Sequence, residues 1–207
     1  MNESEVKDYL SIKLKFSDVA LQKLQILKNE LLLFNKKYNL ISKSTESIVW
    51  HRHILDSAQL VDYINFEDGK SLSDLGSGAG FPGIVIAIFN DNPKFHVKLF
   101  EKSNIKANFL EKIAKITKSK LEVYRGSYIN HNIDSDYILA RAFKKLPEIL
   151  RISRETVKIP HRLIVMKGKN AQTEINNALK IKLFEYKLVQ SITDTESKII
   201  LVDDKKK

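Results

Sequence analysis

The sequence of 207 residues contains no cysteine. This absence excludes disulfides, thiolate zinc sites and cysteine nucleophiles together. The sequence also lacks any uninterrupted apolar run that approaches the roughly 20 residues needed to span a membrane. Its first five residues are acidic in balance and do not show the basic-then-apolar order of a signal peptide. We therefore expect a cytoplasmic protein with no membrane partner.

Acidic residues are too few to balance the basic ones, which leaves a formal net charge of +10 and an isoelectric point near 9.5. Such a balance predicts a polyanionic partner, of which nucleic acid is the commonest in the cytoplasm. The alternative is a lysine-rich surface that serves solubility alone. The distribution favours the first interpretation, because residues 141–169 hold nine basic residues against two acidic ones. No obligate protein partner is evident.

Glycine is scarce as well, and four of the seven glycines fall in the stretch SLSDLGSGAGFPG at residues 71–83. A short apolar run ends at Leu75, and after Pro82 the sequence turns apolar at once. Proline suits the first turn of a helix, since its missing N–H has no partner there. The stretch is therefore typical of a strand, a tight glycine loop and a buried helix. Such a loop admits a ligand close to the backbone, and the helix N-terminus behind it favours an anionic group.

The glycine spacing narrows the kind of ligand. Gly76, Gly78 and Gly80 do not have the spacing of the dinucleotide fingerprint, and no Gly-Lys-Ser/Thr of a P-loop follows. Asp74, just before the first glycine, suits a ligand ammonium group. Glu101 ends the next strand-like run, where it suits ribose hydroxyls. A glycine loop alone is often only a turn, but the loop with these two acids predicts S-adenosylmethionine.

Residues 4–64 are predicted to be helical. From Ser17, a residue type favoured at N-caps, apolar residues recur in steps of three and four along one amphipathic helix. The pattern breaks at residues 38–42, where Asn39 is a candidate loop residue near a ligand. Ser44 or Thr45 is expected to cap a further helix that contains residues 50–57.

From residue 71 the pattern alternates between strands and helices. Strands are expected at 71–75, 95–101, 121–125, 136–141, 162–167, about 183–190 and 198–203, and helices at 82–90, 104–117, 145–157 and 171–179. This order predicts an α/β fold, a parallel sheet with helices on both faces. The last two strands have no helix between them, so they are expected to form a hairpin and give one antiparallel edge.

Ligands bind such sheets beyond the carboxyl ends of the strands. Those ends comprise residues 76–81, Glu101, residues 125–128, Arg141 and Lys167. Each basic residue alone could be a plain surface charge. Together they place positive charge around the mouth that must also admit a substrate.

Several blocks of the sequence resemble one family, RsmG, which is also called glucose-inhibited division protein B. The blocks occur in the family's order and rough spacing: Asn39-Leu40, residues 52–57 (RHILDS), 74–83 (DLGSGAGFPG), 140–143 (ARAF) and Lys167-Gly168. The resemblance implies an enzyme that uses S-adenosylmethionine to methylate guanine N7 in 16S ribosomal RNA, whether naked or within the small ribosomal subunit. It also implies a Rossmann-like class I methyltransferase: a helical N-terminal segment (1–65), a seven-stranded methyltransferase domain (66–204) and a basic tail (205–207).

The resemblance and the loop together give a set of expected site residues. Those expected to bind the cofactor are Asp74, Gly76, Gly78, Gly80, Phe81, Glu101, Ser127, Tyr128 and Arg141. Those expected to bind RNA are Arg125, Lys144, Lys145 and Lys167, and the candidates for positioning the reactants are Asn39 and Arg141. The chain departs from the family in three places: residues 125–129 hold no acidic residue, isoleucine replaces threonine after Asn39-Leu40, and the tail after residue 190 matches poorly.

Guanine N7 carries a free lone pair, so its methylation requires no prior loss of a proton. The contribution expected from the enzyme is therefore positioning, and we assign no general base. In duplex RNA the N7 edge lies in a groove too narrow for side chains, so the target is expected in a loop or unpaired strand. A cation beside a purine that becomes positive would oppose the reaction. The basic residues are thus expected to hold phosphates or the cofactor.

His53 and Asp56 share a helix face at a spacing that resembles half of a metal site. No third ligand has suitable spacing and methyl transfer needs no metal, so we expect none. We interpret the pair as a polar contact that holds the N-terminal helices against the glycine loop. Two other functions stay open: a small-molecule methyltransferase of the same fold, and an RNA-binding protein whose glycine loop is vestigial.

Overall fold

The computed structural model describes residues 1–205, so Lys206 and Lys207 of the predicted tail lie outside the described residues. The chain begins with two helices, α1 (Glu3–Ile12) and α2 (Asp18–Tyr38). Short helical elements follow: the 3₁₀-helix η1 (Lys43–Ile48), the π-helix η2 (Trp50–Leu55), α3 (Asp56–Ala58) and the 3₁₀-helix η3 (Gln59–Tyr63). The predicted helical character of residues 4–64 is confirmed.

Helix α2 begins where the sequence predicts, because the Ser17 hydroxyl accepts a hydrogen bond from the Ala20 N–H at 3.2 Å. Its buried stripe faces the rest of the core. The predicted cap at Ser44 or Thr45 is wrong. The Thr45 hydroxyl donates to the Ser42 carbonyl at 2.9 Å instead, and η1 begins directly after Ser42.

The sheet has seven strands in the order β3-β2-β1-β4-β5-β7-β6. They are β1 (Ser71–Leu75), β2 (His96–Glu101), β3 (Glu122–Arg125), β4 (Tyr137–Arg141), β5 (His161–Lys167), β6 (Lys187–Gln190) and β7 (Lys198–Asp204). All neighbouring pairs are parallel except those of β7, which runs antiparallel to both β5 and β6. The predicted hairpin at this edge is therefore confirmed, although β6 begins only at Lys187.

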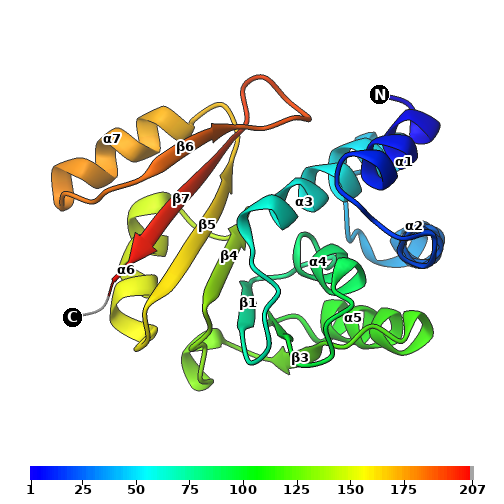
Figure 1. Ribbon diagram of the computed structural model, residues 1–207, viewed down its shortest axis with the longest axis horizontal. Helices are drawn as coiled ribbons and strands as arrows, with labels where there is room; N and C mark the ends of the chain where they lie inside the picture. Colours follow the sequence, from blue (N-terminus) through cyan, green and yellow to red (C-terminus); the bar gives the residue numbers. More distant parts are fainter. Residues whose placement is uncertain (206–207) are drawn as a thin grey trace.

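The connecting helices are α4 (Gly83–Phe89), α5 (Asn104–Thr117), α6 (Leu146–Thr156) and α7 (Ala171–Ile181). Helices α4 and α5 lie on one face of the sheet with the N-terminal helices, and α6 and α7 lie on the other (Figure 1). The core has two matching parts: Leu24 and Phe109 belong to the first, and Ile149 and Ile175 to the second. The predicted α/β fold is confirmed, whereas the boundary at residue 65 stays a prediction.

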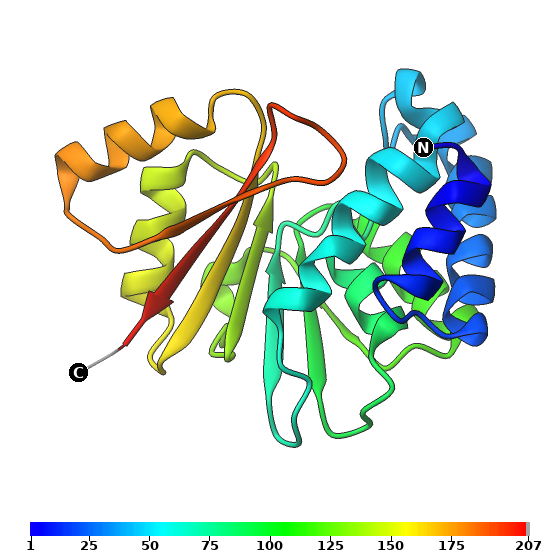
Figure 2. The same ribbon diagram turned by 45° about the horizontal axis from the view of Figure 1, so that its top comes forward.

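The strand order fixes where a ligand site can lie. The chain runs outward from β1 to β3 and then returns to place β4 on the other side of β1, so the order reverses between β1 and β4. In an open parallel sheet, ligands bind in the crevice outside the carboxyl ends at such a reversal. The loop between β6 and β7 and the N-terminal helices approach each other near the carboxyl ends of the strands (Figure 2). None of the helices within residues 1–205 has the length and apolar character of a membrane span.

Candidate active site

The predicted glycine loop directly follows β1 at this crevice. Gly76 and Gly78 have φ angles of 72° and 60°, in the left-handed region that favours glycine. The N–H groups of Gly76 and Ser77 donate to the Phe100 carbonyl at 2.9 and 3.1 Å, which anchors the loop to β2. A Cβ atom added at Gly78 would meet only the Gly76 carbonyl, at 3.8 Å. That face of the loop is therefore open to a ligand.

A cavity of about 700 Å³ lies in front of the loop. It brings together most of the predicted cofactor residues, namely Gly76, Gly78, Phe81, Glu101, Ser127, Tyr128 and Arg141. It is also lined by residues that the sequence reasoning missed: Leu40, Ile41, Lys102, Lys106 and Phe143. Three of them carried a signal that could have found them: Lys102 directly follows Glu101, and Leu40 and Phe143 belong to the sequence blocks that resemble the family.

The Glu101 carboxylate is fixed in the wall of the cavity. One oxygen accepts the Gly78 N–H at 2.8 Å, and the other accepts the Ser103 N–H at 2.7 Å. Because the residue is only 6% exposed, these two bonds set its direction in advance of any ligand. Each oxygen retains a further lone pair for a hydroxyl donor.

Asp74 lies buried beneath the loop, outside the lining of this cavity. One carboxylate oxygen accepts the N–H of Gly83, the first residue of α4, at 3.0 Å. The other has no hydrogen-bond partner among the described residues. Burial raises the pKa of Asp74 to about 6, against the opposing effect of the hydrogen bond from the Gly83 N–H. Asp74 therefore holds the start of α4 beneath the loop, and its predicted place near a ligand ammonium stays a prediction.

Two other predicted residues also lie outside the cavity lining. A Cβ atom at Gly80 would meet the Ile84 side chain at 2.5 Å, so this glycine lets the loop pack against α4. Asn39 ends α2 with a φ of 28°, and its neighbours Leu40 and Ile41 line the cavity in its place. Both residues therefore shape the site without facing it.

The Arg141 guanidinium, at the end of β4, is surrounded by the π-helix η2 and by α3. It lies 3.4 Å from an Asp56 carboxylate oxygen, and it donates to the Arg52 carbonyl at 3.2 Å and to the Ser57 hydroxyl at 3.4 Å. The irregular turn makes this possible, because the Asp56 N–H bonds to the His53 carbonyl and leaves the Arg52 carbonyl to accept from Arg141. Both side chains of the ion pair are nearly buried, with 16% of Arg141 and 6% of Asp56 exposed.

His53 joins this ion pair to the glycine loop. Its ring stacks on Phe81 with the centroids 5.1 Å apart, and its Nδ1 and Nε2 lie 3.3 Å from Arg141 and 2.9 Å from the Thr45 hydroxyl. Arginine only donates, so Nδ1 accepts and Nε2 carries the proton. Burial, followed by the charges of Arg141 and Arg52, lowers the pKa of His53 to about 3. The imidazole is therefore neutral at physiological pH and serves as a polar contact.

Within residues 1–205 no group of three His, Cys, Asp or Glu side chains is arranged to hold a metal ion.

Lys167 is expected from the sequence to bind RNA, and the structure corrects this expectation. Its side chain is only 10% exposed, and its ammonium lies 2.9 Å from the Glu174 carboxylate and 2.5 Å from the Lys144 carbonyl. Glu174 also accepts the Leu146 N–H at 2.6 Å. The Lys167 ammonium therefore holds the turn between β4 and α6 and is not available to a phosphate.

The other predicted RNA contacts differ in their freedom. Arg125 forms a two-pronged pair with Glu111 at 3.0 and 2.6 Å, so its guanidinium is directed at α5. Lys144 lines the cavity and pairs with Glu148 one helical turn away. Lys145 is exposed and has no ion pair within residues 1–205. Lys145 is therefore the predicted residue that is best placed for a phosphate.

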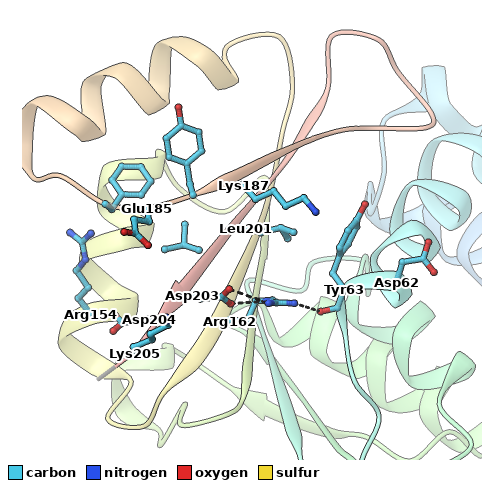
Figure 3. A pocket seen from close by; sticks show the side chains of 13 residues that line it. Asp62, Tyr63, Arg154, Arg162, Glu185, Lys187, Leu201, Asp203, Asp204 and Lys205 are labelled. Carbon is cyan, nitrogen blue, oxygen red and sulfur yellow. Dashed lines mark hydrogen bonds and ion pairs between the residues drawn. The ribbon is translucent and has the colours of Figure 1, made fainter. Parts of the chain in front are cut away.

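A second large cavity, of about 740 Å³, lies at the other end of the sheet (Figure 3). Arg162, the second residue of β5, donates there to Asp203 at 2.7 Å and to the Tyr63 carbonyl at 3.4 Å. Among the described residues, the two cavities share none of their lining. The length of β5 thus separates this cavity from the glycine loop. The loop cavity is the candidate active site because it brings together most of the predicted cofactor residues.

Comparison with known proteins agrees with this geometry. The family model described as rRNA small subunit methyltransferase G matches residues 20–202. The chain belongs to this family, RsmG. The protein of that name from Rickettsia typhi is 39% identical over 184 residues, which are 89% of this chain and 94% of that protein. Its namesake from Orientia tsutsugamushi is 36% identical over 197 residues, which are 95% of this chain and 96% of that protein. The resemblance seen in the sequence is confirmed.

Solved structures show the fold of this RsmG chain at lower identity. An O-methyltransferase from Bacillus cereus in complex with SAH has a TM-score of 0.60 at 14% identity, and the match covers 97% of both chains. Fibrillarin from Aeropyrum pernix, with natively bound S-adenosyl-L-methionine, has a TM-score of 0.57 at 14% identity and covers 73% of this chain and 75% of its own. The Rossmann-like methyltransferase fold is therefore confirmed.

The buried Asp74 makes the stability of the protein depend on pH. Its pKa in the folded state, about 6, is higher than the ordinary value of 3.8, so the folded chain binds this proton more tightly than the unfolded chain. The stabilisation that comes from this tighter proton binding is fully present below about pH 4 and is lost as the pH rises to about 6. Above that pH the contribution of Asp74 to stability no longer changes. In Asp74→Asn, the free energy of unfolding relative to wild type should increase by about 1–3 kcal/mol between pH 4 and pH 7.5.

Urea unfolding of the wild type, Asp74→Asn and the exposed control Asp91→Asn at both pH values measures this difference. The control should keep the same offset from wild type throughout. An Asp74→Asn offset that does not change with pH would contradict the raised pKa.

Proposed function

We propose that the protein transfers a methyl group from S-adenosylmethionine to N7 of a guanine in 16S ribosomal RNA. As a member of the RsmG family it is an S-adenosylmethionine-dependent methyltransferase of small-subunit ribosomal RNA. The observation that carries the proposal at the level of the site is the open face of Gly78 beside the fixed Glu101 carboxylate. A nucleoside can lie against such a backbone while its ribose hydroxyls donate to the carboxylate.

The residues of the cavity suit the parts of S-adenosylmethionine. Glu101 would receive the ribose, and Gly78 leaves room beside it. Tyr128 and Phe143 meet edge to face, with ring centroids 5.6 Å apart, and form an aromatic wall suited to the adenine. When bound, S-adenosylmethionine supplies a methyl group that is activated by its attachment to a sulfonium.

The chain's own residues position the reactants and move no proton. His53 already accepts from Arg141 and donates to Thr45, so both of its nitrogens are occupied. The low pKa of His53 makes it a poor proton acceptor. A free lone pair on the acceptor, as at guanine N7, is the kind of nucleophile that such a site can serve. Placing two reactants together then supplies the rate enhancement.

The rim of the cavity supports an RNA substrate over a small molecule. Lys102 and Lys106 line it, and the exposed Lys145 lies where α6 begins. Lysines spaced around a mouth attract a phosphate backbone. The partner is then 16S ribosomal RNA or the small ribosomal subunit, and the reaction takes place in the cytoplasm. An intact glycine loop and a fixed Glu101 do not favour a vestigial site.

Cofactor binding is tested by two glycine variants with matched backbone strain. Gly78 and Gly69 have φ angles of 60° and 77°, and an added Cβ meets nothing closer than 3.8 Å at either position. Gly78→Ala places a methyl group in the cavity, whereas Gly69→Ala places one in the turn before β1. By calorimetry, Gly78→Ala should bind S-adenosylmethionine at least about tenfold more weakly, a loss of about 1.4 kcal/mol, and Gly69→Ala should bind like the wild type. Equal binding by both variants would remove the loop from the site.

RNA binding is tested by its dependence on salt. Replacing Lys106 and Lys145 by Ala should reduce the slope of log affinity against log salt by about 1–2, because each lost phosphate contact removes just under one unit. Lys118→Ala with Lys120→Ala, at the far end of α5, keeps the same net charge change and should preserve the slope. An affinity for RNA that does not vary with salt would reduce the positive charge to a solubilising surface.

The acceptor atom is tested by product and by pH. Mass mapping of 16S ribosomal RNA from a strain that lacks this gene should show one missing N7-methylguanine, which the gene restores. In single-turnover assays the chemical step should be flat from pH 6 to 9, since N7 loses no proton and His53 does not titrate there. A pH-dependent limb that disappears in His53→Gln would contradict the N7 assignment and indicate a base-catalysed transfer.

A further inference from the structure

The loop between β6 and β7, residues 191–197, is bonded to the N-terminal helical segment. Figure 1 shows it reaching from the two strands towards those helices. The Thr193 hydroxyl donates to an Asp56 carboxylate oxygen at 2.7 Å, and the Ile192 N–H donates to the Gln59 side chain at 3.0 Å. The Gln59 amide in turn donates to the Ser191 hydroxyl at 3.1 Å. The hairpin itself is closed by a separate bond, from the Ser191 N–H to the Ser197 carbonyl at 3.1 Å.

Asp56 carries the contact from this loop to the active site. Its Oδ1 accepts from Thr193, and its Oδ2 lies 3.4 Å from the Arg141 guanidinium. One buried carboxylate therefore bridges the β6–β7 loop and a residue of the cofactor cavity.

Thr193 is the partner that fixes the rotation of this carboxylate. Among the side-chain donors to Oδ1, Thr193 at 2.7 Å is closer than Gln59 at 3.1 Å and Ser191 at 3.5 Å. A rotation about the Cβ–Cγ bond of Asp56 would carry Oδ2 away from Arg141, whose contact is already long. Loss of the Thr193 hydroxyl would leave the bridge with only its weaker donors.

Arg141 stands where two cavities meet. It lines the cavity in front of the glycine loop and also a smaller one, of about 230 Å³, whose walls include Ser191 and Ser197 of the β6–β7 loop. The position of the Arg141 guanidinium therefore affects both the small cavity beside the β6–β7 loop and any ligand bound in the larger cavity.

We propose that Thr193 is a positioning residue, which holds Arg141 through Asp56 and so couples the β6–β7 loop to cofactor affinity. The inference rests on the proposed function only for the identity of the cofactor. Because coupling between two sites is reciprocal, a ligand that moves the loop would weaken cofactor binding by the same factor by which the cofactor opposes that movement.

Three threonine variants test the proposal by calorimetry with S-adenosylmethionine. Thr193→Val removes the donor at nearly constant shape, Thr193→Ser keeps it, and Thr195→Val alters an exposed residue of the same loop. Thr193→Val should bind about five- to tenfold more weakly, within the usual range of such couplings. Thr193→Ser and Thr195→Val should bind like the wild type. Wild-type affinity in Thr193→Val, or an equal loss in Thr195→Val, would overturn the proposal.

A second measurement needs no ligand. In the folded wild type, the side-chain N–H signals of Arg141 in NMR spectra should exchange slowly with water, because partners surround the guanidinium. These signals should be lost or broadened in Thr193→Val and retained in Thr195→Val. Retention in Thr193→Val would overturn the proposal. If no variant or wild type binds S-adenosylmethionine while this NMR difference is present, the proposed function fails and the positioning role stands.

Discussion

The buried ion pair between Arg141 and Asp56 constrains the arrangement of the whole site. Removing two charges from water costs several kcal/mol, which their attraction offsets only when other polar groups satisfy them as well. Those groups come from distant parts of the chain: the Arg52 carbonyl and the His53 ring from the π-helix, and the Thr193 hydroxyl from the β6–β7 loop. The N-terminal helices, the end of β4 and the last hairpin therefore have to meet around one guanidinium.

A second buried charge supports the glycine loop and is less well satisfied. Asp74 has one oxygen bonded to the Gly83 N–H and one without a partner among the described residues. A Cβ atom at Gly83 would meet this carboxylate at 2.6 Å and Leu99 at 2.3 Å, so the start of α4 presses directly on it. Carboxylates with such raised pKa values are concentrated at functional sites. An ionised Asp74 beneath the loop also favours a cationic ligand above it.

The sequence predicted the elements that local patterns determine. Strand β1 and helix α5 have the predicted bounds, and the cap at Ser17 forms as expected. The π-helix was not predicted, because its turn is irregular and the Arg141 guanidinium that it contacts comes from β4, far along the chain. The directions of Lys167 and Arg125 also escaped prediction, since each follows from a carboxylate on another element. The position of Glu101 could be predicted, because the carboxyl end of a strand fixes where its side chain lies. The buried position of Asp74 could not, because it follows from the packing of α4 against β1.

The arrangement of positive charge around the site accords with the proposed chemistry. Inside, each buried cation is matched by an acid: Arg141 by Asp56, and Lys167 by Glu174. Lysines that remain available lie outside this interior: Lys102 and Lys106 line the cavity, and Lys145 is exposed where α6 begins. Methylation at N7 makes a neutral purine cationic, so an unpaired cation beside it would raise the barrier, and at an effective dielectric constant near 20 two unit charges 4 Å apart repel by about 4 kcal/mol. A cationic rim attracts the phosphates of RNA. Because the charges of the interior are neutralised, the base that becomes positive during the reaction meets no unpaired cation there.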